Sequence, residues 1–467
     1  MYYASLSEAE KCITRVINRF RLRSICQSLL LMAFFDGLFY LYKTIIMKNI
    51  LFPTLPLFIL TILLFSSCEK GNNPLKPYEA TDHPVVWSYS MGMHNTGSKT
   101  IPAMDADGNI YFAVQNNEND PISVFAIDKT GNELWKKEFT GRLTSQLISQ
   151  EDNLYFSGQT SETRSLTWCL SRTNGEIMWL NSSQQKGGCV MAVSHDYIVT
   201  GALSGGYVTG DEDTYELVIM NKTGEILTSV SIGNGVASIS IVGNTLYYIT
   251  HHVSGTGYAK IKLTKYNLSS GAVDWVHETG NNDENWRVAS PDLVVDNNDK
   301  VYFVSQFGLN VTLHIINSDG SVFKEISLSE VNDVTLTPSL DTDGNIYIGA
   351  PGYLQKYSPA GDLIWSFEDY NYTSASINIT YAPFLASGEK IYYGGEGLFA
   401  VNTTPEMAYI VYPETGFTAP GYPLLNNDGD IITVGNGYVN CLKGDGQHLQ
   451  NSAWPKIYQN NGNSASR

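Results

Sequence analysis

The feature that most constrains this chain is a unit of four short apolar runs joined by tight turns. In residues 337–365 these runs are separated by an Asp-Gly turn at Gly344 and by a second turn ending at Gly361. Glycine supplies the positive φ angle that such turns require. The pattern therefore predicts a meander of four β-strands. A sheet of this size cannot bury both of its faces alone, so it needs neighbouring sheets of the same kind.

Two motifs recur in phase along the chain and predict a β-propeller. A strand core, centred in most copies on Tyr, occurs eight times with first residues 40 to 55 apart, at Ile110, Leu154, Tyr197, Leu246, Val301, Ile346, Ile391 and Ile431. A Gly-x-x-x-Trp ending follows four copies, at Trp135, Trp179, Trp275 and Trp365, while Thr228 and Lys324 take the Trp position in two others. A four-stranded repeat of this length is typical of a propeller blade. We expect an all-β, eight-bladed β-propeller of four-stranded antiparallel blades, with seven blades as the alternative.

The ends of the repeats resemble those of the PQQ-type propeller family. Residues 169–175, which read Cys-Leu-Ser-Arg-Thr-Asn-Gly, and residues 126–131, one position shorter, match its pattern of a small residue, Leu, Asp and a Thr-Gly turn before Trp. The resemblance covers roughly residues 85–455. It implies the fold and leaves function open, because the family includes both enzymes and non-catalytic scaffolds.

The two ends of the repeat region complement each other. Residues 85–89 resemble the last strand of a blade although no blade precedes them, and the eighth copy has Gln450 where Trp is expected. We therefore expect the N-terminal strand to complete the last blade and close the ring, which removes an open sheet edge. The tail containing Trp454 has no role that the pattern predicts.

The N-terminal part resembles a bacterial lipoprotein signal. An apolar run at residues 50–65 is followed by Ser66, Ser67 and Cys68, and such a Cys would be lipidated and become the new N-terminus. The expected layout is a mis-called extension at residues 1–46, a signal peptide at 47–67, a flexible tether at 68–84 and the propeller at 85–467. An uncleaved membrane anchor is the alternative for the signal, and a genuine extra helix is the alternative for residues 1–46. The signal predicts an outer-membrane lipoprotein of the bacterial cell envelope.

Composition and motifs exclude several kinds of site. The formal charge of −17 argues against nucleic acid as a partner. Cys169 and Cys441 occupy the small-residue position of their repeats, so we expect them to be packing residues. The Asp-x-Asp-Gly stretches at Asp105 and Asp341 lack the twelfth-position Glu of an EF-hand and are expected to be turns. We therefore predict no catalytic residues, no metal and no cofactor.

The expected binding surface lies on long loops of the third to fifth blades. Loops on a rigid scaffold are where binding residues concentrate, although solvated loops without a ligand are the alternative. The candidate residues are Tyr207, Asp211, Glu212, Asp213, His251, His252, Asp283, Glu284 and Trp286.

Three functions are compatible with the sequence. The first is a non-catalytic lipoprotein that binds an envelope protein, similar in plan to the outer-membrane assembly lipoprotein of the family. The second is a surface protein that binds glycans through aromatic rings. The third, a quinoprotein dehydrogenase, is disfavoured because this chain lacks the adjacent Cys pair that the resemblance implies for such enzymes.

Overall fold

The computed structural model describes the propeller region with short gaps. The described residues are 85–92, 98–160, 164–186, 189–202, 215–232, 235–253, 259–279, 286–288, 292–308, 310–328, 337–350, 353–368, 384–387, 390–394, 398–402, 408–410, 423–435, 437–456 and 458–467. They belong to one compact unit, Leu75–Arg467. Within these ranges the chain forms strands and turns, and none of it makes a helix suited to crossing a membrane.

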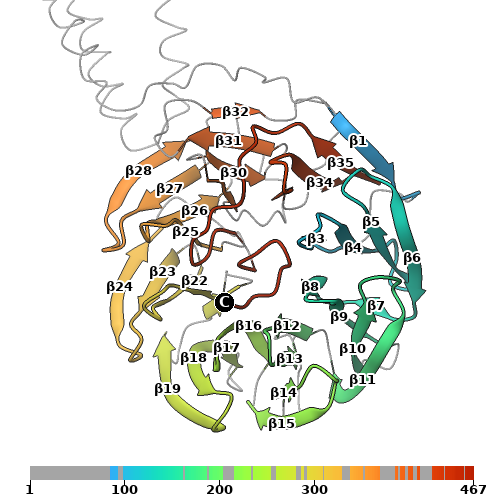
Figure 1. The fold of residues 1–467 in the computed structure, drawn as a ribbon. Helices are drawn as coiled ribbons and strands as arrows, with labels where there is room; N and C mark the ends of the chain where they lie inside the picture. The colour runs from blue at the N-terminus through green and yellow to red at the C-terminus, as the bar shows by residue number, and fades with distance from the viewer. Residues whose placement is uncertain are drawn as a thin grey trace, which may run out of the picture. The chain divides into compact units, whose positions relative to one another are not determined.

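The described strands form eight sheets, each with a main path of four strands, arranged around one axis (Figure 1). Blade 1 contains β2 (Ser98–Lys99), β3 (Ala103–Met104), β4 (Ile110–Gln115), β5 (Ile122–Ile127) and β6 (Glu133–Phe139). Blade 2 contains β7 (Arg142–Leu143), β8 (Ile148–Gln150), β9 (Asn153–Gln159), β10 (Arg164–Ser171) and β11 (Ile177–Lys186). Blade 3 contains β12 (Cys189–Val193), β13 (Ile198–Ala202), β14 (Glu216–Met220) and β15 (Ile226–Ser231), and blade 4 contains β16 (Val236–Val242), β17 (Thr245–Val253), β18 (Ala259–Asn267) and β19 (Ala272–Thr279).

Blades 5 to 8 complete the ring. Blade 5 contains β20 (Trp286–Val288), β21 (Val294–Val295), β22 (Val301–Phe307), β23 (Asn310–Ile316) and β24 (Val322–Ser327). Blade 6 contains β25 (Ser339–Leu340), β26 (Ile346–Ala350), β27 (Tyr353–Tyr357) and β28 (Leu363–Glu368), and blade 7 contains β29 (Phe384–Leu385), β30 (Lys390–Gly394), β31 (Leu398–Asn402) and β32 (Ala408–Ile410). Blade 8 contains β33 (Leu424–Leu425), β34 (Ile431–Gly435), β35 (Tyr438–Leu442) and β1 (Val85–Ser90). The predicted all-β propeller of four-stranded antiparallel blades is confirmed, and the described strands make up eight sheets.

The N-terminal strand closes the ring as the sequence predicts. β1 pairs antiparallel with β35, and Trp87 lies opposite Cys441 in the register. This places Trp87 in the slot that Trp135 holds opposite Ala126 in blade 1. The last blade is therefore assembled from both ends of the propeller region.

The repeated Trp joins its blade to the next at several junctions. Trp135 of blade 1 donates a hydrogen bond from Nε1 to the carbonyl of Arg172 in blade 2, at 3.0 Å. A Cβ atom on Gly175 would lie 2.6 Å from the Trp135 ring, so only glycine fits beneath it. The same pairing joins Trp179 to Gly224, Trp275 to Gly320 and Trp87 to Gly131. The repeat period therefore follows from contacts between blades as well as within them.

Two blades depart from this arrangement in the positions that the sequence indicates. Lys324 takes the Trp place and donates to the carbonyl of Ala360 at 3.1 Å and to the Asp362 carboxylate at 2.7 Å. Thr228, opposite Ile219, does not reach the facing glycine: a Cβ on Gly271 would meet only the hydroxyl of Tyr266 within 4 Å.

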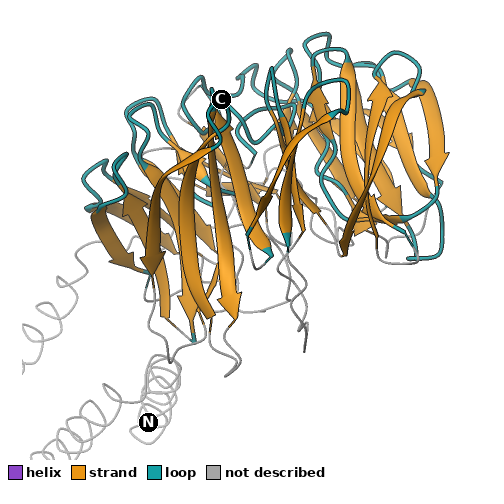
Figure 2. Cartoon of the chain, turned by 90° about the horizontal axis from the view of Figure 1, so that it is seen from below, coloured by secondary structure: helices purple, strands orange, loops and turns teal. Residues whose placement is uncertain are grey.

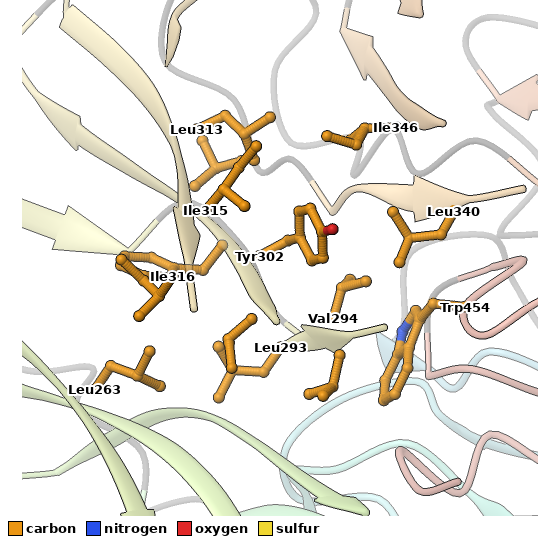
Figure 3. Packing of buried hydrophobic residues seen from close by; sticks show 14 of the residues in the cluster. Leu263, Leu293, Val294, Tyr302, Leu313, Ile315, Ile316, Leu340, Ile346 and Trp454 are labelled. Atoms are coloured by element: carbon orange, nitrogen blue, oxygen red, sulfur yellow. The ribbon is translucent and has the colours of Figure 1, made fainter. Parts of the chain in front are cut away.

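The hydrophobic core lies mainly between neighbouring blades. One large cluster joins blades 4, 5 and 6 through Ile249, Leu313 and Ile346 and includes Trp454 from the C-terminal tail (Figure 3). Cys169 and Cys441 are buried free thiols, which confirms them as packing residues. Burial raises the pKa of the Cys169 thiol to about 11 and of Cys441 to about 12, so both stay protonated at neutral pH.

Candidate functional site

The structure places the backbone of three of the predicted binding residues. His251 and His252 lie near the end of β17, paired with Ile261 and Lys260, and Trp286 begins β20 opposite Phe307. Their side chains are outside what the structure describes. Tyr207, Asp211, Glu212, Asp213, Asp283, Glu284 and the predicted lipidation site Cys68 lie outside the described residues altogether.

The strand order shows which strands the predicted binding loops connect. Residues 203–214 connect β13 to β14, and residues 254–258 connect β17 to β18, so both join the second and third strands of a blade. Residues 280–285 lead from blade 4 into blade 5. That the candidate side chains share one surface stays a prediction.

The Asp-x-Asp-Gly stretches are turns, as expected. Asp105 accepts the backbone N–H groups of Asp107 and Asn109, both at 2.9 Å, and the hydroxyl of Tyr111 at 2.8 Å. Burial and this hydrogen bond hold the pKa of Tyr111 far above its usual value. Asp341 repeats the arrangement with Tyr347 in blade 6. These carboxylates cap turns and anchor the repeated Tyr, and no group of His, Cys, Asp or Glu within the described ranges is arranged to hold a metal ion.

A polar triplet in blade 5, in which Ser305 and His314 are buried and Glu325 is exposed, was not anticipated from the sequence. The Ser305 hydroxyl lies 2.6 Å from Nε2 of His314, and Nδ1 of His314 lies 3.0 Å from the Glu325 carboxylate. Phe303 stacks on the imidazole with ring centroids 4.6 Å apart. Burial lowers the pKa of His314 to about 4, so the ring is neutral at pH 7.

The three side chains are ordered as a nucleophile, a base and an acid, but a substrate has no access to the nucleophile. Ser305 is fully buried on a central strand, so its hydroxyl meets no solvent from which a substrate could arrive. Across the interface, His277 of β19 is half-buried, and its Nε2 has no hydrogen-bond partner. The sequence gives little signal for the triplet, because His314 shares its side of β23 with the polar Asn310 and Thr312 as well as with Ile316.

The axis of the ring is occupied by the C-terminal tail, which we define as residues 449–467 (Figure 1). The tail contacts innermost strands around the ring, and Trp454, Lys456, Asn463 and Ser464 are almost fully buried. The tail therefore lies where a propeller has a central channel.

The tail is anchored at one buried carboxylate. Asp292 of blade 5 accepts the indole N–H of Trp454 at 3.0 Å and the backbone N–H of Tyr458 at 2.6 Å. Lys456, also buried, donates to the Asn463 side chain at 2.8 Å. Burial raises the pKa of Asp292 to about 7 and lowers that of Lys456 to about 7, and each is opposed by the charge of the other.

Comparison with known proteins adds a family to this geometry. A family model described as outer membrane protein assembly factor BamB matches residues 164–393, from β10 to β30. This chain is a β-propeller, and over residues 164–393 it is similar to a PQQ-like repeat family. A search of curated proteins by sequence found no match.

Solved structures share the β-propeller fold at low identity. The computationally designed protein Ika8 aligns with a TM-score of 0.55 and 13% identity, covering 76% of this chain and 98% of that one. Quinohemoprotein alcohol dehydrogenase from Comamonas testosteroni aligns at 0.51 and 14%, covering 77% and 76%. The C-terminal WD40 domain of Sif2 aligns at 0.53 and 10%, covering 78% and 99%. At such identities these likenesses establish the fold alone.

Proposed function

We propose that this PQQ-like propeller is a non-catalytic, lipid-anchored scaffold of the bacterial cell envelope that binds another protein. The observation that carries the proposal is the family model match over residues 164–393, since that model describes an outer membrane protein assembly factor. The lipoprotein-like stretch ending at Cys68 supports the location.

Features of the described residues support binding rather than catalysis. Ser305, the one hydroxyl placed against a histidine and a carboxylate, is buried. The ring axis, a usual place for a ligand in a propeller, is filled by the tail that Trp454 anchors. A chain with a formal charge of −17 favours a partner with a basic surface.

The decisive experiment is a pull-down from native bacterial envelope with the lipidated full chain as bait. Wild type is compared with a triple variant, Asp211→Asn, Glu212→Gln and Asp213→Asn, and with Trp286→Ala. We expect both to recover less partner, because charge steers association and aromatic side chains dominate interface energetics. The triple variant should also weaken the dependence of binding on salt.

The matched control removes three carboxylates from turns that join other strands: Asp107→Asn, Asp152→Asn and Glu176→Gln, all exposed. This variant should recover as much partner as wild type. Cys68→Ala should fail to label with an acyl-chain probe; labelling of this variant would refute the lipid anchor. If no protein is recovered while a glycan array binds the same bait, the glycan-binding alternative replaces the proposal. Absorbance changes on titration with quinone would instead point to a dehydrogenase.

A further inference from the structure

The ring is complete without the C-terminal tail. Every blade has its four-stranded path, and pairing of β1 with β35 closes the circle. The tail contributes no strand to any sheet, and the large apolar clusters lie between blades. Of the tail residues, Ala453, Trp454 and Ala465 are the buried members of these clusters. The strand pairing that closes the ring therefore does not use the tail.

The tail is held largely through the main chain, in the manner of a bound peptide. Innermost strands are sheet edges, and each leaves N–H groups unpaired unless something covers them. Six blades donate such an N–H to a tail carbonyl at 2.8 to 3.0 Å: Met104 to Asn461, Ser149 to Gly462, Val193 to Ser464, Ile241 to Ala465, Leu340 to Trp454 and Leu385 to Pro455. Blade 8 accepts the Asn461 amide at the carbonyl of Leu425. Main-chain hydrogen bonds from sheet edges are a recurring element of peptide recognition.

Side chains of the tail give this capture its specificity. The Trp454 ring lies beside Leu340 and Val294 in the innermost layer (Figure 3), and its N–H is donated to Asp292. A single amide, that of Asn463, donates to the carbonyls of Ile101, Pro102 and Leu147 at 3.0 to 3.3 Å. An aromatic anchor in a pocket with a buried acceptor is the pattern of a recognition site.

The backbone of the tail is shaped by the ring. Tyr458, Gln459, Asn463 and Ala465 have positive φ angles of 50° to 70°. Residues other than glycine avoid this region unless their surroundings impose it. A free tail would relax these angles, so its bound conformation depends on the contacts that the ring supplies.

We propose that the axial face of the ring is a peptide-binding site and that the chain's own C-terminal tail is its resident ligand. The ligand class is a bent segment carrying a Trp-Pro-Lys sequence, with the Trp N–H on Asp292 and main-chain carbonyls on the inner strands. The site is distinct in its residues from the loop surface proposed above, and neither proposal depends on the other.

The test uses the full chain with a protease site inserted after Gly446, which is exposed and has no atom within 4 Å of a Cβ built on it. After cleavage of the folded protein, we expect the tail to remain bound and to exchange with a labelled synthetic peptide of residues 447–467. Binding should saturate at one peptide per ring. The folded state before and after release is followed by circular dichroism and by the melting temperature.

Matched variants separate recognition from general stability. Asp292→Asn in the cleaved ring, and a peptide with Trp454→Ala, should each weaken binding about tenfold or more, because each loses a charge-assisted hydrogen bond. Asp274→Asn, the same change on exposed β19, should bind like wild type. A ring that stays folded after release but binds no peptide would overturn the proposal. So would a ring that unfolds on losing the tail and is not restored by added peptide, or a tail that never exchanges.

Discussion

The indole of Trp87 lies over Gly131 and donates its N–H to the carbonyl of Lys129 at 3.0 Å. These residues belong to β1, which completes blade 8, and to the turn between the third and fourth strands of blade 1. The contact therefore crosses the junction where the ring closes. It is the same contact that internal blades make through Trp135, Trp179 and Trp275.

Trp87→Ala should weaken ring closure. Trp87 is half-buried, so we expect the free energy of unfolding to fall by about 1–3 kcal/mol, less than for a fully buried Trp. Chemical denaturation of the two proteins measures the difference. Val86→Ala, a change on the same strand at a side chain 50% exposed, is the control and should cost less than about 0.5 kcal/mol. Equal stability of Trp87→Ala and wild type would mean that this junction does not limit the ring.

Gly175→Ala should destabilise the protein more than Gly271→Ala. Both glycines have nearly the same φ, +70° and +72°, so both variants bear the cost of a left-handed alanine, about 1 kcal/mol. Only at Gly175 would the new methyl group meet an indole, with 2.6 Å to the Trp135 ring, which adds about 1–3 kcal/mol. Melting temperatures of the pair isolate the packing cost, and equal losses would contradict the contact.

Thr228→Trp should stabilise the junction of blades 3 and 4. Thr228 is exposed, and a Cβ on Gly271 would meet only the Tyr266 hydroxyl, at 3.5 Å, so an indole could lie over the glycine and donate to the turn. We expect a gain of about 0.5–2 kcal/mol, seen as a higher melting temperature. Thr228→Phe, which supplies the ring without the N–H donor, should recover part of the gain. A loss of stability in the Trp variant would show that the gap between these blades is not available.

Acidification should destabilise the protein through His314. Its folded pKa of about 4 lies below the ordinary value of 6.5, so the unfolded chain binds a proton first as the pH falls. The stability contribution is fully present above about pH 6.5 and is lost on the way to pH 4, by up to about 3 kcal/mol. His314→Gln should flatten the pH dependence of unfolding between pH 7 and pH 4.5. His448→Gln, at an exposed residue, should leave it unchanged.

The fold was predictable because the repeat records contacts that recur in several blades. The Asp-Gly turns need glycine, the Tyr of three blades is held by a capping Asp, and four Trp rings need a glycine in the next blade, so these copies share the same spacing. Ring closure was predictable for the same reason. The strand that carries Trp87 has no blade before it, and the eighth copy of the repeat has Gln450 where Trp is expected.

The axial site and the polar triplet were not predictable from one sequence. Asp292 meets Trp454 across 162 positions, and neither belongs to a repeated motif. Ser305, His314 and Glu325 come together only through the strand register of one blade, which leaves no fixed spacing to recognise. That the loop residues from Tyr207 to Trp286 form a binding surface remains a prediction, because the sequence of a binding loop depends on its partner and not on the repeat.

Pairing of β1 with β35 also determines when this protein can finish folding. Ser88 and Asn440 share a hydrogen bond although 352 positions separate them. During synthesis the first strand must wait without its partner until almost the whole chain has emerged, and a growing ring presents two unpaired strand edges throughout that time. Long-range pairing of this kind folds slowly and exposes intermediates to aggregation. We expect truncated or stalled chains to depend on chaperones far more than the finished ring does.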